Sequence, residues 1–319
     1  MNSKSKSYAN KKKISIVVPV YNEEESISLF LDRIIPVIDS ININYEIIFS
    51  LDPSSDNTQL IIEKAIDKNK NIKLLLFSRR FGQPAAVMAG IFHAVGDYCV
   101  VIDVDLQDPP ELIETMYHKL IEGYDVVYAK RISRKGETLL KRIISSFGYY
   151  VINKLTDVQI PKDTGDFRIF TKRIIIELKS LKESHGFLRG LVSFVGFKQA
   201  FIEYDRETRE KGVGHYNQFT GSFKIGLNGL IGFSSKPLFF MSILGIVFSL
   251  FSFLLCLFYL ILKINGTEFP IGLATTVILI TFFAGINFLG LGLIGEYVGR
   301  IYDEVKSRPM FIIDKKINF

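Results

Sequence analysis

Two long stretches without a charged residue constrain this chain more than any other feature. The first runs from Leu238 to Leu262 and the second from Phe269 to Gly295. A helix needs about 20 apolar residues to cross the hydrocarbon core of a membrane, and each stretch exceeds that length. Buried helices of soluble proteins usually keep a polar stripe, which both stretches lack. The sequence therefore predicts a transmembrane hairpin over 237–296 rather than two core helices.

The charges beside these stretches predict the orientation of the hairpin. Its outer ends are flanked by the basic residues Lys224, Lys236, Arg300, Lys306 and Arg308, whereas the loop between the stretches carries only Lys263 and Glu268. Basic residues next to membrane helices stay on the cytoplasmic side. We therefore expect a multi-pass protein of the cytoplasmic (inner) membrane, with both termini and the rest of the chain in the cytoplasm.

Glycines in and after the second stretch bear on assembly. They are Gly285, Gly290, Gly292, Gly295 and Gly299. Small residues let membrane helices approach closely, so these positions allow either packing within one chain or a homo-oligomer.

The part of the chain before the hairpin shows an α/β pattern. Apolar strands are expected over 14–20, 45–51, 72–77, 97–102 and 125–129, and they alternate with helices expected over 23–38, 56–67, 84–95 and 109–121. Continuous apolar strands separated by helices are typical of a mostly parallel, Rossmann-like sheet covered on both faces.

Less regular segments complete the predicted organisation. Residues 1–13 form a basic tail, expected to be disordered, and 14–214 form the α/β domain. An amphipathic interfacial segment is predicted over 215–236 and a cytoplasmic C-terminal tail over 297–319. The formal net charge is +6, with many lysines in the first thirteen residues. No basic stripe with interleaved aromatic residues is present, so nucleic acid is not an expected partner.

One stretch carries the strongest chemical signal. Val100–Ile102 is the end of an apolar strand, and Asp103 and Asp105 follow it one residue apart, with Gln107 and Asp108 next. Ligands of open α/β sheets gather at the carboxyl ends of strands. Carboxylate and amide oxygens at that place suit a hard divalent ion that also binds substrate phosphates.

With this motif the chain resembles the family 2 glycosyltransferases of GT-A fold, and within them the polyprenyl-phosphate sugar synthases, which include dolichyl-phosphate mannose synthase and bactoprenol glucosyltransferases. The resemblance covers nearly the whole chain after the tail, including both apolar stretches. It rests on five ordered motifs: Val18–Glu23, Ser78–Gly82, Asp103–Pro109, Thr164–Arg168 and Arg206–Arg209.

The resemblance implies an inverting transfer of a hexose from a nucleotide sugar (UDP-glucose or similar, with UDP favoured over GDP) to polyprenyl phosphate. It places the nucleotide sugar on Pro19, Tyr21, Glu23, Asp52, Asp103 and Asp105. It places Mg²⁺ or Mn²⁺ on Asp105 and Gln107. Asp166 and Asp103 are the implied catalytic residues, and Arg131, Arg134, Arg206 and Arg209 are candidates for the acceptor phosphate.

The acceptor chemistry refines the expected role of Asp166. A lipid phosphate has a second pKa of about 6, so it is largely dianionic at neutral pH. A strong general base is therefore less necessary than for a sugar hydroxyl. We hypothesise that Asp166 positions the acceptor or the metal more than it removes a proton.

Several positions depart from the family pattern. The usual Asp-Asp-Gly-Ser turn is Leu51–Ser54 here, Gln83 stands for a lysine, His215 stands for another lysine, and Phe194 occupies a position that often holds tryptophan. These departures leave open a different donor, a different acceptor or reduced activity. They motivate one alternative, a non-catalytic or divergent membrane subunit. A processive polysaccharide synthase is a second alternative, but it normally needs a Gln-x-x-Arg-Trp motif and this chain has no tryptophan.

Overall fold

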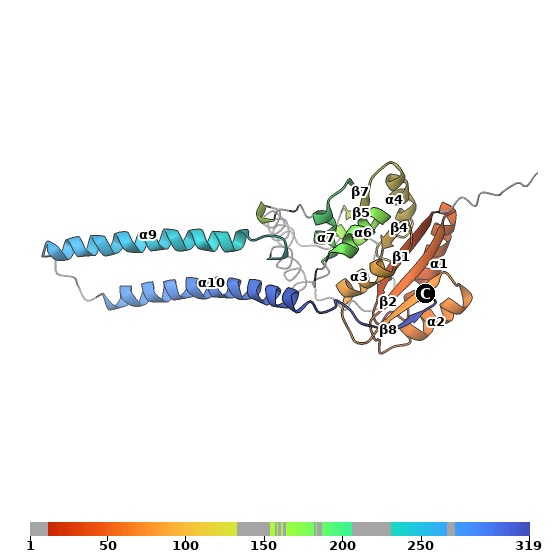
Figure 1. Ribbon diagram of the computed structural model, residues 1–319, viewed down its shortest axis with the longest axis horizontal. Coiled ribbons are helices and arrows are strands. Elements are labelled where there is room, and N and C mark those ends of the chain that lie inside the picture. The colour runs from red at the N-terminus through yellow and green to blue at the C-terminus, as the bar shows by residue number, and fades with distance from the viewer. Residues whose placement is uncertain are drawn as a thin grey trace, which may run out of the picture. The chain divides into compact units, whose positions relative to one another are not determined.

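The computed structural model describes residues 12–132, 154–156, 158, 161, 164–181, 183, 187–205, 231–266 and 272–319. These residues belong to two compact units (Figure 1). The first holds the described residues up to 132, from 158 to 205, and from 308 to 319. The second holds 154–156 and the long helices up to Ser307.

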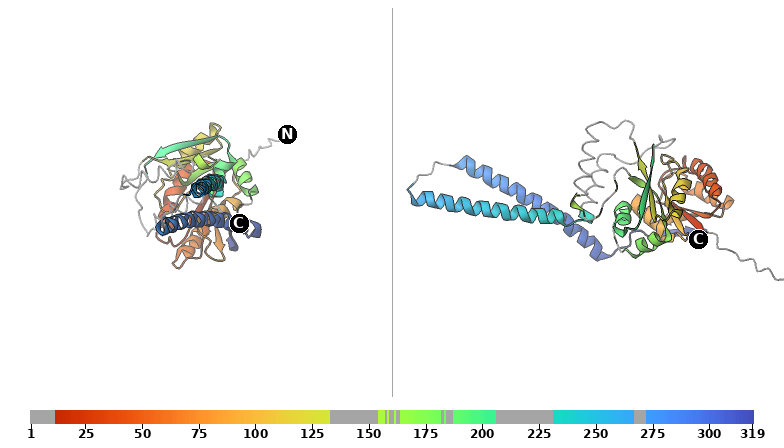
Figure 2. Two further views of the ribbon diagram at one scale, coloured as in Figure 1. Left: turned by 90° about the vertical axis from the view of Figure 1, so that its left-hand side faces the viewer. Right: turned by 90° about the horizontal axis from the view of Figure 1, so that it is seen from above.

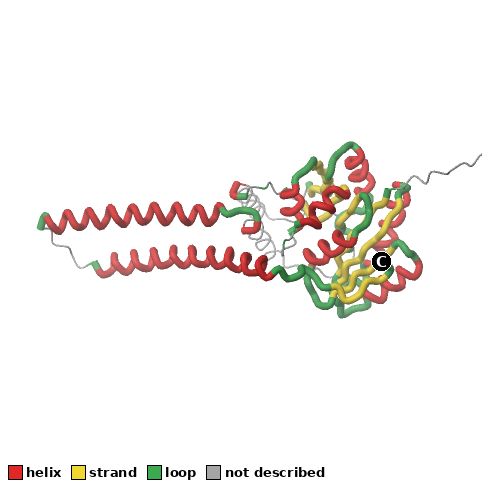
Figure 3. The backbone as a smooth tube through the Cα atoms, in the orientation of Figure 1, coloured by secondary structure: helices red, strands yellow, loops and turns green. Residues whose placement is uncertain are grey.

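In the described part of the first unit, eight strands form one sheet in the order β7-β5-β6-β4-β1-β2-β3-β8 (Figure 3, yellow). Their bounds are β1 Lys13–Val20, β2 Asn44–Leu51, β3 Ile72–Phe77, β4 Tyr98–Val101, β5 Val126–Arg131, β6 Thr164–Thr171, β7 Gln199–Tyr204 and β8 Ile313–Ile317. The pairs β1–β2, β1–β4, β2–β3 and β5–β7 are parallel. The pairs β3–β8, β4–β6 and β5–β6 are antiparallel. The predicted mostly parallel α/β sheet is confirmed.

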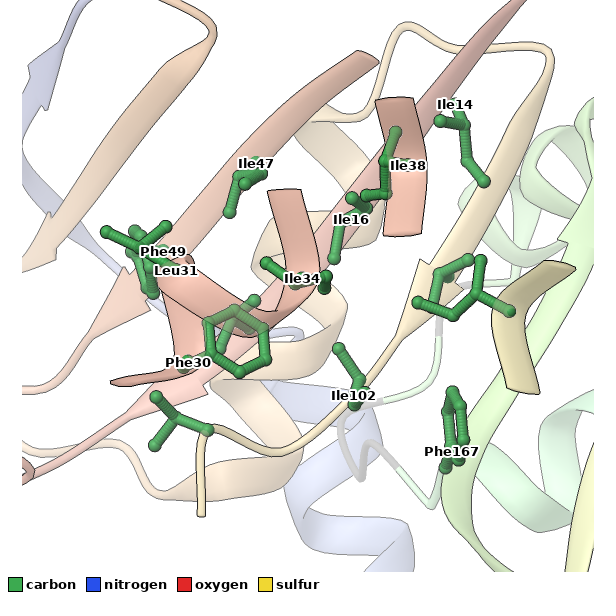
Figure 4. Packing of buried hydrophobic residues seen from close by; sticks show 14 of the residues in the cluster. Ile14, Ile16, Phe30, Leu31, Ile34, Ile38, Ile47, Phe49, Ile102 and Phe167 are labelled. Atoms are coloured by element: carbon green, nitrogen blue, oxygen red, sulfur yellow. The ribbon is translucent and has the colours of Figure 1, made fainter. Parts of the chain in front are cut away.

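Helices cover both faces of this sheet. They are α1 Ile27–Ile41, α2 Thr58–Lys68, α3 Gln83–His93, α4 Leu112–Ile121, α6 Lys172–Ser180 and α7 Leu188–Val195. Alternate residues of β1, among them Ile14 and Ile16, share one apolar core with α1, α2 and α4. Figure 4 shows this core between the strands and Ile34 and Ile38 of α1. On the opposite face α3 lies so close to β1 that a Cβ on Gly90 would stand 2.2 Å from a methyl of Val17.

The second unit contains two long helices, α9 Lys236–Ile264 and α10 Leu273–Lys306, which run side by side (Figures 1 and 2). Phe248 of α9 packs edge-on against Phe283 of α10, with ring centroids 5.6 Å apart. Over Lys236–Leu255 and Ile278–Lys306 these helices are long and apolar enough to cross a membrane, judged by length and composition. A Cβ on Gly290 would lie 3.0 Å from the Met241 side chain, so this glycine is used within the chain.

The structure adds elements that the sequence analysis did not separate. Residues 308–319, expected only as a tail, belong to the first unit and contain β8. Helices α6 and α7 were also not predicted. The basic tail up to residue 11 and residues 215–230 of the predicted interfacial segment lie outside the described residues.

Candidate active site at the carboxyl edge of the sheet

The predicted site residues converge because of strand direction. Strands β1, β2, β3 and β4 run parallel to one another. Strand β6 is antiparallel to both β4 and β5, and β7 is parallel to β5, so β5 and β7 have the same direction as the first four strands. Their carboxyl ends therefore meet at one edge of the sheet, called the carboxyl edge below. The residues that follow β1, β2 and β4, and the residue that opens β6, lie at this edge, as expected for open α/β sheets.

The turn after β4 orients its acidic side chains. Leu106 has a left-handed backbone conformation, with φ 57°, which is uncommon for a residue with a side chain. The carboxylate of Asp105 accepts a hydrogen bond from the Gln107 backbone N–H at 3.2 Å. Asp103 accepts one from the Gln83 side-chain amide at 2.9 Å. Non-glycine residues in this backbone region cluster at active sites and binding turns.

Asp166 reaches the same place from β6. Val101 of β4 lies opposite Arg168 of β6, so continuing this antiparallel register by two residues brings Asp166 beside Asp103. The guanidinium of Arg189, on α7, donates to the Asp166 carboxylate at 3.0 Å. Burial raises the pKa of Asp166, but Arg189 and Arg168 outweigh that effect and hold its pKa below the usual value. Asp166 is therefore an ionised carboxylate beside an arginine.

The side chain of Arg168 holds the backbone that carries Asp166. It is buried and donates to the backbone oxygens of Gly165, at 2.8 Å, and Asp166, at 3.3 Å. Burial lowers the pKa of Arg168 to about 10, against the opposing effect of Asp166. Arg168 therefore remains a cation at neutral pH while fixing the backbone on which Asp166 stands.

Asp108, Arg131 and Tyr204 form a second polar group at the edge. Asp108 is buried and accepts from the Tyr204 hydroxyl, and one Asp108 oxygen lies 3.5 Å from the Arg131 guanidinium. Arg131 also donates to the Tyr204 oxygen at 3.2 Å. A Cβ on Gly165 would stand 2.7 Å from the Arg131 guanidinium, so a side chain at this position would displace the arginine from its present place.

The acidic residues crowd together at the edge. Burial, together with the charges of Asp105, Asp108 and Asp166, raises the pKa of Asp103 to about 8, against the lowering effect of Arg131. Such crowding of carboxylates is relieved by a bound cation, which fits a divalent metal on Asp105 and Gln107. Within the described residues no group of three or more His, Cys, Asp or Glu side chains is arranged to hold a metal ion.

The expected nucleoside residues lie beside this cluster, in different environments. The Tyr21 ring is covered by the Arg80 guanidinium at 3.9 Å. The buried Asp52 carboxylate accepts from the backbone N–H groups of Phe81 and Gly82, both at 2.9 Å. The Glu23 carboxylate accepts from the Ser26 hydroxyl at 2.6 Å.

Pro19 has a different position from these residues. It is buried in β1, opposite Ser50 of β2 and one residue before the strand ends.

The loops after β1 and β2 hold each other in place. The Asn22 backbone N–H donates to the Ser54 hydroxyl at 3.0 Å, and the Asn22 side chain accepts from the Ser55 backbone N–H at 2.9 Å. The Glu23 backbone N–H donates to the Thr58 hydroxyl at 2.9 Å. These reciprocal contacts preorganise the surface on which a nucleoside is expected.

The structure thus brings together Tyr21, Glu23, Asp52, Asp103, Asp105, Gln107, Arg131 and Asp166 at one edge. Arg134, Arg206, Arg209 and His215 lie outside the described residues. The sequence analysis did not single out Arg189 or Tyr204. Tyr204 is the last residue of β7, so the strand-end rule that found Asp103 also points to it. Arg189 lies on an unpredicted helix, and no local motif marks it.

Comparisons with known proteins agree with this geometry. Residues 15–179 match the family model described as Glycosyl transferase family 2. The uncharacterized glycosyltransferase YkcC of Bacillus subtilis is 44% identical over 301 residues, which cover 94% of this chain and 93% of that protein. The SfII prophage-derived bactoprenol glucosyl transferase of Shigella flexneri is 36% identical over 303 residues, 95% of this chain and 98% of the relative.

A solved structure shares the fold. Glucosyl-3-phosphoglycerate synthase from Mycobacterium tuberculosis, in complex with Mn²⁺, uridine diphosphate and phosphoglyceric acid, superposes with a TM-score of 0.51 at 18% identity, over 69% of this chain and 76% of that one. At this identity the likeness concerns the fold alone. The family model and the relatives show that the chain belongs to glycosyltransferase family 2.

Proposed function

We propose that this glycosyltransferase moves a hexose from a nucleotide sugar to polyprenyl phosphate at the cytoplasmic face of the membrane. The observation that carries the proposal is the carboxyl edge, where Asp103, Asp105 and Asp166 stand beside Arg131 and Arg189. Acidic oxygens for a metal that binds the donor diphosphate, next to Arg131 as a candidate for the acceptor phosphate, suit a donor and an acceptor that both carry phosphate.

The two apolar helices and the bactoprenol glucosyl transferase relative support a lipid acceptor. In the proposed reaction an oxygen of the lipid phosphate attacks the anomeric carbon. The bond from that carbon to the nucleoside diphosphate breaks, which inverts the carbon and releases the diphosphate. A divalent metal, when bound, would offset the negative charge of the leaving diphosphate.

The residues of the chain have separate proposed roles. Asp105 and Gln107 would hold the metal, and the loops that carry Tyr21 and Asp52 would hold the nucleoside. Asp166 is an ionised carboxylate fixed by Arg189 at 3.0 Å. An ionised side chain held in this way supports a positioning role toward the acceptor, since the lipid phosphate has little need of a base.

UDP-glucose, or a similar UDP-sugar, is the donor we propose first. The test is transfer of radiolabelled sugar from a panel of UDP- and GDP-sugars to undecaprenyl phosphate, in detergent with Mg²⁺ or Mn²⁺. We expect a labelled lipid with one donor, and no labelled lipid from the Asp105→Ala variant. Nucleotide binding without transfer to any polyprenyl phosphate would refute the acceptor, and absence of both would favour a non-catalytic subunit.

The proposed topology has its own test. Both termini and the catalytic domain are placed in the cytoplasm by the basic residues at the outer ends of the hairpin. A single cysteine introduced at Asn265, between α9 and α10, should be labelled by an impermeant maleimide from outside the cell. A cysteine at Ser307 should be labelled only after the membrane is opened, and the reverse pattern would refute the topology.

A further inference from the structure

The C-terminal segment Phe311–Phe319 lies against the loop that borders the donor side of the candidate site. The chain reaches this segment after α10, yet β8 pairs antiparallel with β3, from Leu74 opposite Ile317 to Phe77 opposite Ile313. The pairing extends beyond β3, because the Ser78 backbone N–H donates to the Ile312 oxygen at 3.1 Å. Ser78 is the first residue of the loop Ser78–Gly82, called the β3–α3 loop below.

Aromatic side chains link the two segments as well. The Phe311 ring lies 6.1 Å from Phe77 and 5.9 Å from Phe92 of α3. Phe77 in turn contacts the Phe81 ring of the β3–α3 loop edge-on, at 6.0 Å. Phe311 therefore packs on both elements that flank the loop, the end of β3 and the body of α3.

The other side of the same loop touches the expected donor residues. Its backbone N–H groups at Phe81 and Gly82 bind the Asp52 carboxylate, and Arg80 stacks on Tyr21 at 3.9 Å. The next residue, Gln83, donates to Asp103 at 2.9 Å. Gly82 has a φ of 89°, a conformation that favours glycine, so the loop has one defined course.

From these contacts we infer that the C-terminal segment positions the donor site: Phe311 and the Ile312 carbonyl fix the β3–α3 loop, which in turn places Arg80 and the Asp52 and Asp103 carboxylates. This inference rests on the proposed function. It gives the residues after the membrane hairpin a role in binding the nucleotide sugar. Phe311 is a positioning residue, because the described contacts join it to the elements that flank the loop and not to the acidic side chains.

The far end of the same segment provides a matched control. Phe319 contacts His93 at 5.8 Å and lies under the Lys73 ammonium at 4.9 Å, away from the loop. The Asn318 side chain donates to the Lys70 and Ile72 backbone oxygens, both at 2.7 Å. Substitutions at Phe319 and Asn318 loosen the segment without reaching the β3–α3 loop.

The experiment compares Phe311→Ala and Phe311→Leu with Phe319→Ala and Asn318→Ala in the full chain in detergent. The readouts are KM for the nucleotide sugar, KM for undecaprenyl phosphate, kcat, the unfolding midpoint and the Kd for UDP with Mn²⁺. We expect Phe311→Ala to raise the donor KM and the UDP Kd about tenfold, as loss of one aromatic contact would. The lipid KM should not change, Phe311→Leu should fall between, and the two control variants should keep the donor KM of the wild type.

Other results would overturn the inference. It fails if Phe311→Ala keeps the donor KM and the UDP Kd of the wild type, or if the control variants raise them equally. It also fails if the donor and lipid KM rise together, because that indicates general loosening. If the wild type transfers no sugar but binds UDP, the proposed function fails while the UDP Kd still tests the inference. If the wild type binds no nucleotide, both fail.

Discussion

Replacing Arg189 with glutamine should change the pH dependence of transfer, because Arg189 keeps Asp166 ionised. The two side chains are 3.0 Å apart and are 19% and 26% exposed. Burial raises the pKa of Asp166, and Arg189 is the largest of the charges that lower it. Arg168 stays in the variant, so part of the opposing charge remains.

The size of the effect follows from the pair. An arginine next to an aspartate lowers its pKa by about 1–3. With Arg168 retained, we expect the pKa of Asp166 to rise in Arg189→Gln, because the largest charge that opposes the effect of burial is lost. The wild-type pKa is depressed, so Asp166 is ionised throughout the neutral range. In the variant the protonated form appears at higher pH, so activity should fall more at pH 6 than at pH 8.

The assay is kcat/KM for the lipid phosphate between pH 5.5 and 8.5. The lipid phosphate itself titrates near pH 6, and it contributes equally to every variant, so the comparison isolates Asp166. Arg189→Lys keeps a positive charge, so the pH at which activity falls on acidification should change less than it does in Arg189→Gln. Asp166→Asn has no carboxylate to protonate, so its activity should not show the additional fall at low pH that is expected for Arg189→Gln. A loss by the same factor at every pH would refute the reasoning and assign Arg189 to the substrate instead.

Three other substitutions test the remaining structure. Glu46→Gln removes a buried carboxylate that binds Lys73 at 2.9 Å and should lower the free energy of unfolding by about 3 kcal/mol. Burial raises the pKa of Glu46, but its hydrogen bonds lower that pKa by more, so it lies below its usual value. The difference in unfolding midpoint between the wild type and the variant should therefore be full at pH 7 and close as the pH falls below about 4.5. Gly165→Ala should displace the Arg131 guanidinium, since the new Cβ would stand 2.7 Å from it. Because of this displacement, sugar transfer should become at least about tenfold slower, while the unfolding midpoint should stay almost unchanged. Asp105→Asn should abolish the Mn²⁺ dependence of UDP binding in a calorimetric titration.

The sequence was sufficient to predict the candidate site residues that directly follow strands. Asp103 and Asp105 could be found because an apolar run ends directly before them, and the strand direction then fixed which edge they share. Arg189 could not be found in this way, because its partner Asp166 is fixed by β6 and its own helix was not recognised. Strand β8 was missed because Ile313–Ile317 is short and charged, and its partner β3 lies far away in the sequence.

The departures from the family pattern can now be judged by position. Leu51 is fully buried in the apolar core, so its side chain does not face the candidate site. Asp52 keeps both backbone donors, and the Ser54 hydroxyl still joins the loops after β1 and β2 through Asn22.

Among the described residues, the departures that reach the edge are Gln83, bonded to Asp103, and Arg80, which stands where the family pattern has asparagine and stacks on Tyr21. Both lie on the donor side, while Asp166 and its arginine are intact. A subunit that had lost catalysis would have no reason to keep the acidic cluster and the Asp166–Arg189 pair together. The pattern of change therefore favours an active transferase with an altered donor preference over a non-catalytic one.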